Sequence, residues 1–131
     1  MAGVRGGFLL DTSFVIDCWH NRAQALARLE TLVAEGAPLY VTEVVVCELF
    51  AGLLEADRNA AHRFLEPIEF IQPGPEAAVH AGIWRADARR RGATLHLPDA
   101  LIAAAADSAG AAVLTRNVRD FGLAPVSVES Y

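Results

Sequence analysis

Short apolar runs alternate with longer segments of helical periodicity along the whole chain. The runs have the length and composition of buried strands, and several are bounded by glycine or proline. We expect strands at 4–10, 38–41, 68–71, 111–114 and 125–128. Strands separated by helices pair through crossover connections, so this alternation predicts a parallel sheet covered by helices.

The intervening segments show the apolar spacing and the end signals of helices. In 21–35 the apolar residues recur at helical spacing, and Gly36 follows as a stop. We expect helices at 14–19, 21–35, 42–57, 59–65, 76–91 and 98–109. The chain has 131 residues and shows no repeat or linker, so we expect one domain spanning 1–131.

Composition excludes several chemistries. The chain contains no lysine, which excludes a P-loop and Schiff-base catalysis, and its histidines lack zinc-type spacing. The net charge of −5 argues against a protein that coats nucleic acid over its whole surface but permits a local basic patch.

No apolar stretch approaches the ~20 residues of a membrane span, and the N-terminus does not resemble a signal peptide, so we expect a cytoplasmic protein. Cys18 and Cys47 are expected to be buried thiols.

Four carboxylates lie beside segments that should be buried. Asp11 ends the first apolar run, Asp120 follows the fourth, Asp99 begins a helix, and Glu48 lies on a helix face that should meet the core. Each acid has an ordinary alternative: a cap, a first-turn acid, a solvated pair with Arg119, or an arginine partner. Together they would raise one another's pKa or recruit a divalent cation, which prefers oxygen ligands.

Four segments that contain these acids resemble the motifs of PIN-domain proteins in their order and spacing. The segments are 9–13, 46–49, 97–103 and 114–121, and the likeness covers nearly the whole chain. The length also resembles that of the VapC-type toxins of bacterial toxin–antitoxin pairs. The resemblance implies a three-layer α/β/α fold with a central, mostly parallel sheet. It further implies a Mg²⁺-dependent endoribonuclease, with Mn²⁺ as an alternative ion. The implied assembly is a homodimer or a heteromeric complex with an antitoxin.

The resemblance also assigns roles to particular residues. It implies that Asp11, Glu48 and Asp99 hold Mg²⁺, directly or through waters, and that Asp120 is the fourth catalytic carboxylate. Asn117 stands where some relatives carry an acid, so it is a second candidate for the fourth ligand.

Polar and basic residues around the acids are candidates for contacts with substrate. The hydroxyls of Ser13 and Thr115 are expected to orient waters or a phosphate oxygen. Arg116 and Arg119 flank the fourth motif and are candidate contacts to RNA phosphates. An arginine or lysine from an antitoxin would fit the same acidic cleft.

Two other functions stay open at this point. One is a noncatalytic binding module that uses the same fold as a scaffold. The other is a metal-dependent phosphatase, which typically needs a second aspartate two positions after the first, where this chain has Ser13.

Overall fold

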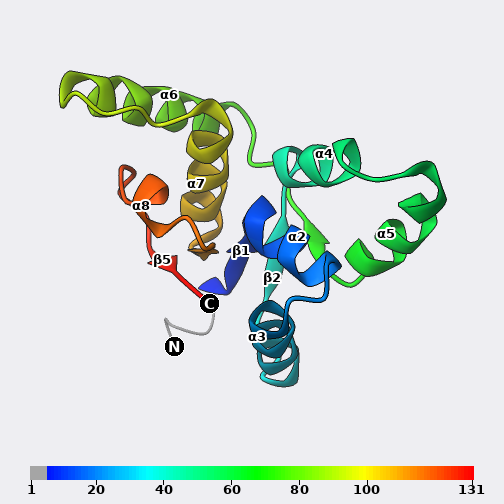
Figure 1. Cartoon of the computed structure of the whole chain (residues 1–131). Coiled ribbons are helices and arrows are strands. Elements are labelled where there is room, and N and C mark those ends of the chain that lie inside the picture. Colours follow the sequence, from blue (N-terminus) through cyan, green and yellow to red (C-terminus); the bar gives the residue numbers. More distant parts are fainter. Residues whose placement is uncertain (1–5) are drawn as a thin grey trace.

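A five-stranded parallel sheet forms the centre of the computed structural model, which describes residues 6–131 (Figure 1). The strands are β1 (Phe8–Leu10), β2 (Leu39–Val41), β3 (Glu69–Phe70), β4 (Ala112–Leu114) and β5 (Val128–Glu129). Their order is β3-β2-β1-β4-β5, and every pair is parallel. The chain therefore leaves β1 toward one side of the sheet and later returns to its other side. In such sheets the crevice for a ligand opens at the carboxyl end of the central strand.

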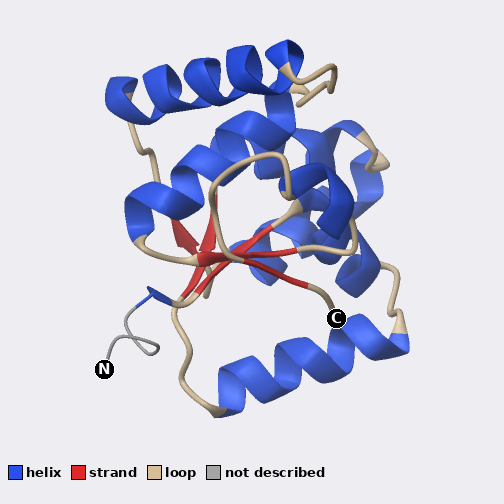
Figure 2. Cartoon of the chain, turned by 90° about the vertical axis from the view of Figure 1, so that its left-hand side faces the viewer, coloured by secondary structure: helices blue, strands red, loops and turns tan. Residues whose placement is uncertain are grey.

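Helices connect the strands and cover both faces of the sheet, as Figure 2 shows. They are α2 (Thr12–Trp19), α3 (Ala23–Ala34), α4 (Glu43–Ala51), α5 (Arg58–Leu65), α6 (Pro75–Arg90), α7 (Leu97–Ala109) and the short α8 (Val118–Phe121). The predicted three-layer α/β/α arrangement is confirmed, and the sheet, predicted to be mostly parallel, is parallel throughout the described residues.

Helix α7 packs against both the sheet and several neighbouring helices. It contacts β1, β4, α4, α6 and α8, and residues 102–106 are all buried. A helix buried on most of its circumference carries apolar residues all round, and alanine lets its backbone approach the sheet closely. Within residues 6–131, no helix is both long and apolar enough to cross a membrane.

Several predicted element boundaries were wrong. The single helix expected at 42–57 ends at Ala51, where Gly52 is the C-cap, and a 3-10 turn at Glu55–Asp57 precedes α5. The last strand is Val128–Glu129 instead of 125–128, because Pro125 has no N–H to donate to a sheet. Helix α8 was not predicted. The first strand begins at Phe8, and residues 4 and 5 of its predicted range lie outside the described residues.

The two cysteines differ in exposure. Cys18 is buried in α2, as expected, but Cys47 is exposed on α4, so that part of the prediction was wrong. The buried residues of α4 are Val45 and Leu49, and Cys47 lies on another side of this helix.

Gly7 is a tightly packed backbone position directly before β1. Its φ is +65°, and a Cβ added there would lie 2.2 Å from the Pro38 carbonyl oxygen. That same oxygen accepts the Phe8 N–H at 2.9 Å, and the Gly7 carbonyl accepts the Ala112 N–H at 3.1 Å. Glycine at this position therefore lets β1 meet both neighbouring strands.

We expect Gly7→Ala to lower the free energy of unfolding by about 2–5 kcal/mol, through left-handed strain plus overpacking. Gly36→Ala is the matched control, because Gly36 has a φ of +70° but no atom within 4 Å of the added Cβ. The control should cost only the strain, about 1–2 kcal/mol. Urea denaturation of both variants measures the difference. Equal losses would show that the contact with Pro38 relaxes without cost.

Candidate metal and active site

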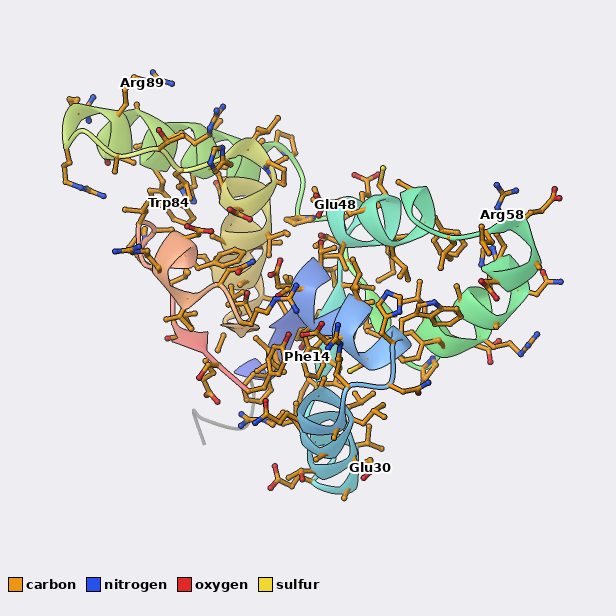
Figure 3. All side chains as sticks on the ribbon, viewed as in Figure 1. Phe14, Glu30, Glu48, Arg58, Trp84 and Arg89 are labelled. Carbon is orange, nitrogen blue, oxygen red and sulfur yellow. The ribbon has the colours of Figure 1, made fainter. Side chains whose placement is uncertain are left out.

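The four acids singled out in the sequence come from four different elements. Asp11 directly follows β1 and is the N-cap residue of α2. Asp99 lies in the first turn of α7, and Asp120 lies in α8, which follows β4. Glu48 lies on α4, above α2 in Figure 3. Both β1 and β4 deliver an acid beyond their carboxyl ends, at the edge of the sheet where ligands bind.

Asp11 is held in place by two hydroxyl groups. It is only 3% exposed, and its Oδ2 accepts hydrogen bonds from Ser13 Oγ at 2.8 Å and from Thr115 Oγ1 at 2.7 Å. The backbone N–H of Asn117 donates to Thr115 Oγ1 at 2.9 Å, which fixes that hydroxyl in turn. The two hydroxyls were expected to orient waters or a phosphate. In this structure they orient the carboxylate itself.

The carboxyl group of Asp99 is influenced by the charges of the other three acids. Burial raises the pKa of its carboxyl to about 6, and the negative charges of Asp11, Asp120 and Glu48 add to the increase. The nearby His96 acts in the opposite direction. The charges of the other three predicted acids therefore act on Asp99, and none of these four acids takes part in an ion pair recorded among residues 6–131.

Glu48 joins this cluster from the surface and not from the core. The prediction that its side chain faces the core was wrong, because Glu48 is exposed while its neighbour Leu49 is buried. Its Oε1 instead accepts a hydrogen bond from Thr12 Oγ1 at 2.5 Å, which ties α4 to the start of α2.

The donor set fits a hard cation such as Mg²⁺, whose remaining ligands are waters. Within residues 6–131, no group of three or more Asp, Glu, His or Cys side chains is close enough to ligate one ion directly. Mg²⁺ is commonly bound by one or two carboxylates and keeps several waters. Carboxylates whose charges raise the pKa of Asp99, and that take part in no ion pair recorded among residues 6–131, suit that mode of binding.

The two candidates for the fourth position differ in their surroundings. Asp120 contributes to the raised pKa of Asp99, so its charge reaches the cluster. Asn117 is the N-cap residue of α8, and its backbone N–H supports Thr115. Asp120 therefore stays the candidate for the fourth acid, whereas the backbone of Asn117 holds the Thr115 hydroxyl in place.

Sequence reasoning missed Asp17 and misjudged the surroundings of Arg116. Asp17 is buried, and its two carboxylate oxygens accept from Arg116 Nη1 at 2.6 and 2.7 Å. Arg116 was expected to contact RNA, whereas its guanidinium is bound to this acid. The available signal was the i, i+4 spacing of Ser13 and Asp17, which places both on one face of a helix. Arg119 is exposed on α8.

The model of the PIN-domain family matches residues 8–123. The chain therefore belongs to the PIN-domain family, as the four motifs predicted.

The chain is also similar to VapC proteins over most of its length. A tRNA(fMet)-specific endonuclease VapC of Salmonella typhimurium is 29% identical over 123 residues, which cover 90% of this chain and 92% of that protein. The crystal structure of DNA-bound VapBC from Salmonella typhimurium matches with a TM-score of 0.79 at 27% identity, over 95% of this chain and 97% of that one. A toxin–antitoxin complex from Klebsiella pneumoniae matches with a TM-score of 0.75 at 26% identity, over 92% and 94% of the two chains. The predicted resemblance to VapC-type proteins is thus confirmed.

Proposed function

We propose that this chain is the toxin of a toxin–antitoxin pair and that it hydrolyses RNA phosphodiester bonds with the help of a divalent cation. Two observations support the proposal: Asp11 lies at the carboxyl end of the central strand β1, and the charges of Asp11, Asp120 and Glu48 add to the raised pKa of the half-buried Asp99. A cluster of like charges is costly to keep without a cation, and phosphodiester hydrolysis is the chemistry that such a cation assists. The naming of the Salmonella relative as an endonuclease supports the same reaction.

The acids of this chain have distinct parts in the proposed site. Asp11 and Asp99 are the candidates for direct ligands of Mg²⁺ or Mn²⁺, and Glu48 and Asp120 are the candidates for holding waters of the ion. A bound divalent cation lowers the pKa of a water and offsets negative charge on the scissile phosphate. The hydroxyls of Ser13 and Thr115 keep the Asp11 carboxylate oriented before any ligand arrives, so little reorganisation accompanies the reaction.

An antitoxin partner is part of the same proposal. The Klebsiella structure is a toxin–antitoxin complex, and the Salmonella structure is a VapBC complex bound to DNA. The exposed carboxylates of Glu48 and Asp120 can accept hydrogen bonds from an arginine or lysine of such a partner. The homodimer, the cytoplasmic location and the single-domain organisation remain predictions.

Cleavage of RNA by the purified protein tests the proposal. We expect cleavage in Mg²⁺, none in EDTA, and recovery when Mn²⁺ is added. Initiator tRNA is the first substrate to try, because the Salmonella relative is named for it, and an elongator tRNA is the matched control. A phosphomonoester offered in parallel tests the phosphatase alternative. Absence of cleavage under all metal conditions would favour the noncatalytic module.

A further inference from the structure

An ion pair between Asp17 and Arg116 joins two of the elements that carry the candidate site, α2 and the segment after β4. The side chain of Asp17 is 9% exposed and binds Arg116 Nη1 through both carboxylate oxygens, while the side chain of Arg116 is 56% exposed. The hydroxyl of Tyr131 donates to Asp17 Oδ2 at 2.5 Å, and its ring meets Phe14 edge-on with centroids 4.8 Å apart. Three segments that are far apart in the sequence, at positions 17, 116 and 131, therefore meet at one carboxylate.

The same segments also hold Asp11. Asp17 and Ser13 lie one turn apart on α2, and Ser13 Oγ accepts the backbone N–H of Arg116 at 3.3 Å as well as donating to Asp11. Thr115, next to Arg116, donates to Asp11 Oδ2. The loop that follows β4 is thus attached to α2 at two levels. Hydroxyl groups attach it near Asp11, and the Arg116 guanidinium attaches it at Asp17.

We propose that Asp17 is a positioning residue for the acidic site and acts by fixing Arg116, and with it the loop 115–117 that supports Asp11 and leads to Asp120. This inference rests on the proposed function for its catalytic part. It gives Arg116 a structural role in the site and leaves Arg119, which is exposed on α8, as the candidate contact to RNA phosphates in this segment. Tyr131 strengthens the attachment by supplying a third hydrogen bond to the same carboxylate.

The charge state of the pair agrees with a permanent attachment. Burial acts to raise the pKa of Asp17, but hydrogen bonds from Tyr131 and Arg116 and the charges of Arg116 and Arg22 outweigh it, and the pKa is lowered. Burial, together with the bond to Asp17, raises the pKa of the Tyr131 hydroxyl, which keeps it protonated as a donor. The ion pair therefore stays intact across the neutral range.

Amide hydrogen exchange of the metal-free protein tests the positioning role without any activity. Asp17→Asn keeps the size of the side chain and removes its charge. We expect exchange at the amides of Arg116 and Asn117, which donate to Ser13 and Thr115, to become about tenfold faster, because local opening is no longer opposed by the ion pair. Exchange at Val113 in the core should stay unchanged. Glu129→Gln is the matched control, since it breaks another pair between distant elements, Arg28–Glu129 at 2.6 Å.

Kinetics with RNA and Mg²⁺ then separate positioning from substrate contact. We expect Asp17→Asn and Arg116→Gln each to lower kcat by about 10–100-fold with little change in KM, as for residues that orient a metal ligand. The double variant should be no worse than either single variant. The proposal is overturned if Arg116→Gln raises KM and weakens the salt dependence while Asp17→Asn has no effect, because that pattern marks a phosphate contact.

Failure of this inference and failure of the proposed function give different results. A wild-type protein that does not cut RNA refutes the nuclease, and the exchange experiment still decides whether Asp17 fixes the loop. An active wild-type protein whose Asp17→Asn variant shows unchanged exchange and unchanged kcat refutes the positioning role alone. Should Asp17→Asn fail to fold, Tyr131→Phe removes one hydrogen bond and keeps the ring contact with Phe14, and the same changes are expected at smaller size.

Discussion

Replacing Asp11 with asparagine should lower the rate of metal-dependent RNA cleavage by about 10²–10³-fold, the cost of losing one electrostatic group that acts in the transition state. The amide keeps an oxygen that can accept hydrogen bonds from Ser13 and Thr115, so the framework around residue 11 stays in place. What disappears is a negative charge at the end of β1. The expected result is therefore an inactive protein with a nearly unchanged melting temperature.

A gel assay of RNA cleavage and a thermal melt of the same preparation measure these two quantities. Asp107→Asn is the matched control, because Asp107 is an exposed acid at the opposite end of α7 from Asp99. The control should cut RNA at the wild-type rate. If the Asp11 variant cuts RNA at the wild-type rate, this carboxylate is not part of the active site. In cells, growth arrest on expression should disappear with Asp11→Asn and persist with Asp107→Asn.

The Asp99→Asn variant should lose activity and gain stability at neutral pH. Burial and the nearby acids raise the pKa of Asp99 to about 6 in the folded chain, above its ordinary value of 3.8. The folded state therefore binds this proton more tightly than the unfolded state. Its free energy of unfolding falls as the pH rises through the window between these two values. Above that window the ionised carboxylate is a constant penalty, which asparagine removes.

Denaturant unfolding of the metal-free protein at several pH values measures this effect. Because Asp99 is partly exposed to solvent, we expect a gain of only about 1 kcal/mol for the variant at neutral pH, and none in acid below the window. Mg²⁺ should raise the melting temperature of the wild type and have little effect on the variant. A variant that is less stable than the wild type at neutral pH would contradict the repulsion described around this carboxyl.

The sequence allowed the position of Asp11 to be predicted, because an acid at the end of a buried apolar run must emerge at the ligand-binding edge of a parallel sheet. Asp99 was predictable for a similar reason, since a proline and an acid mark the first turn of a helix. Glu48 was harder. Helix α4 is apolar around most of its circumference, so its periodicity does not show which side faces the core.

Other features had no local signal at all. Helix α8 has four residues, too few for any periodicity to be seen. The ion pair of Asp17 and Arg116 joins residues 99 positions apart, and each of them alone resembles an ordinary surface charge. Such pairs depend on how the elements pack, and that information appears only once the chain is folded.

The alanine-lined face of α7 has a consequence for variation in this protein. Asp99 is carried by the first turn of a helix in which Ala103 and Ala104, among others, are buried. Adding even two or three carbon atoms at these positions would move the helix outward and take Asp99 away from Asp11. Loss of function can thus arise from a neutral, apolar exchange in the interior that alters neither an acid nor an arginine.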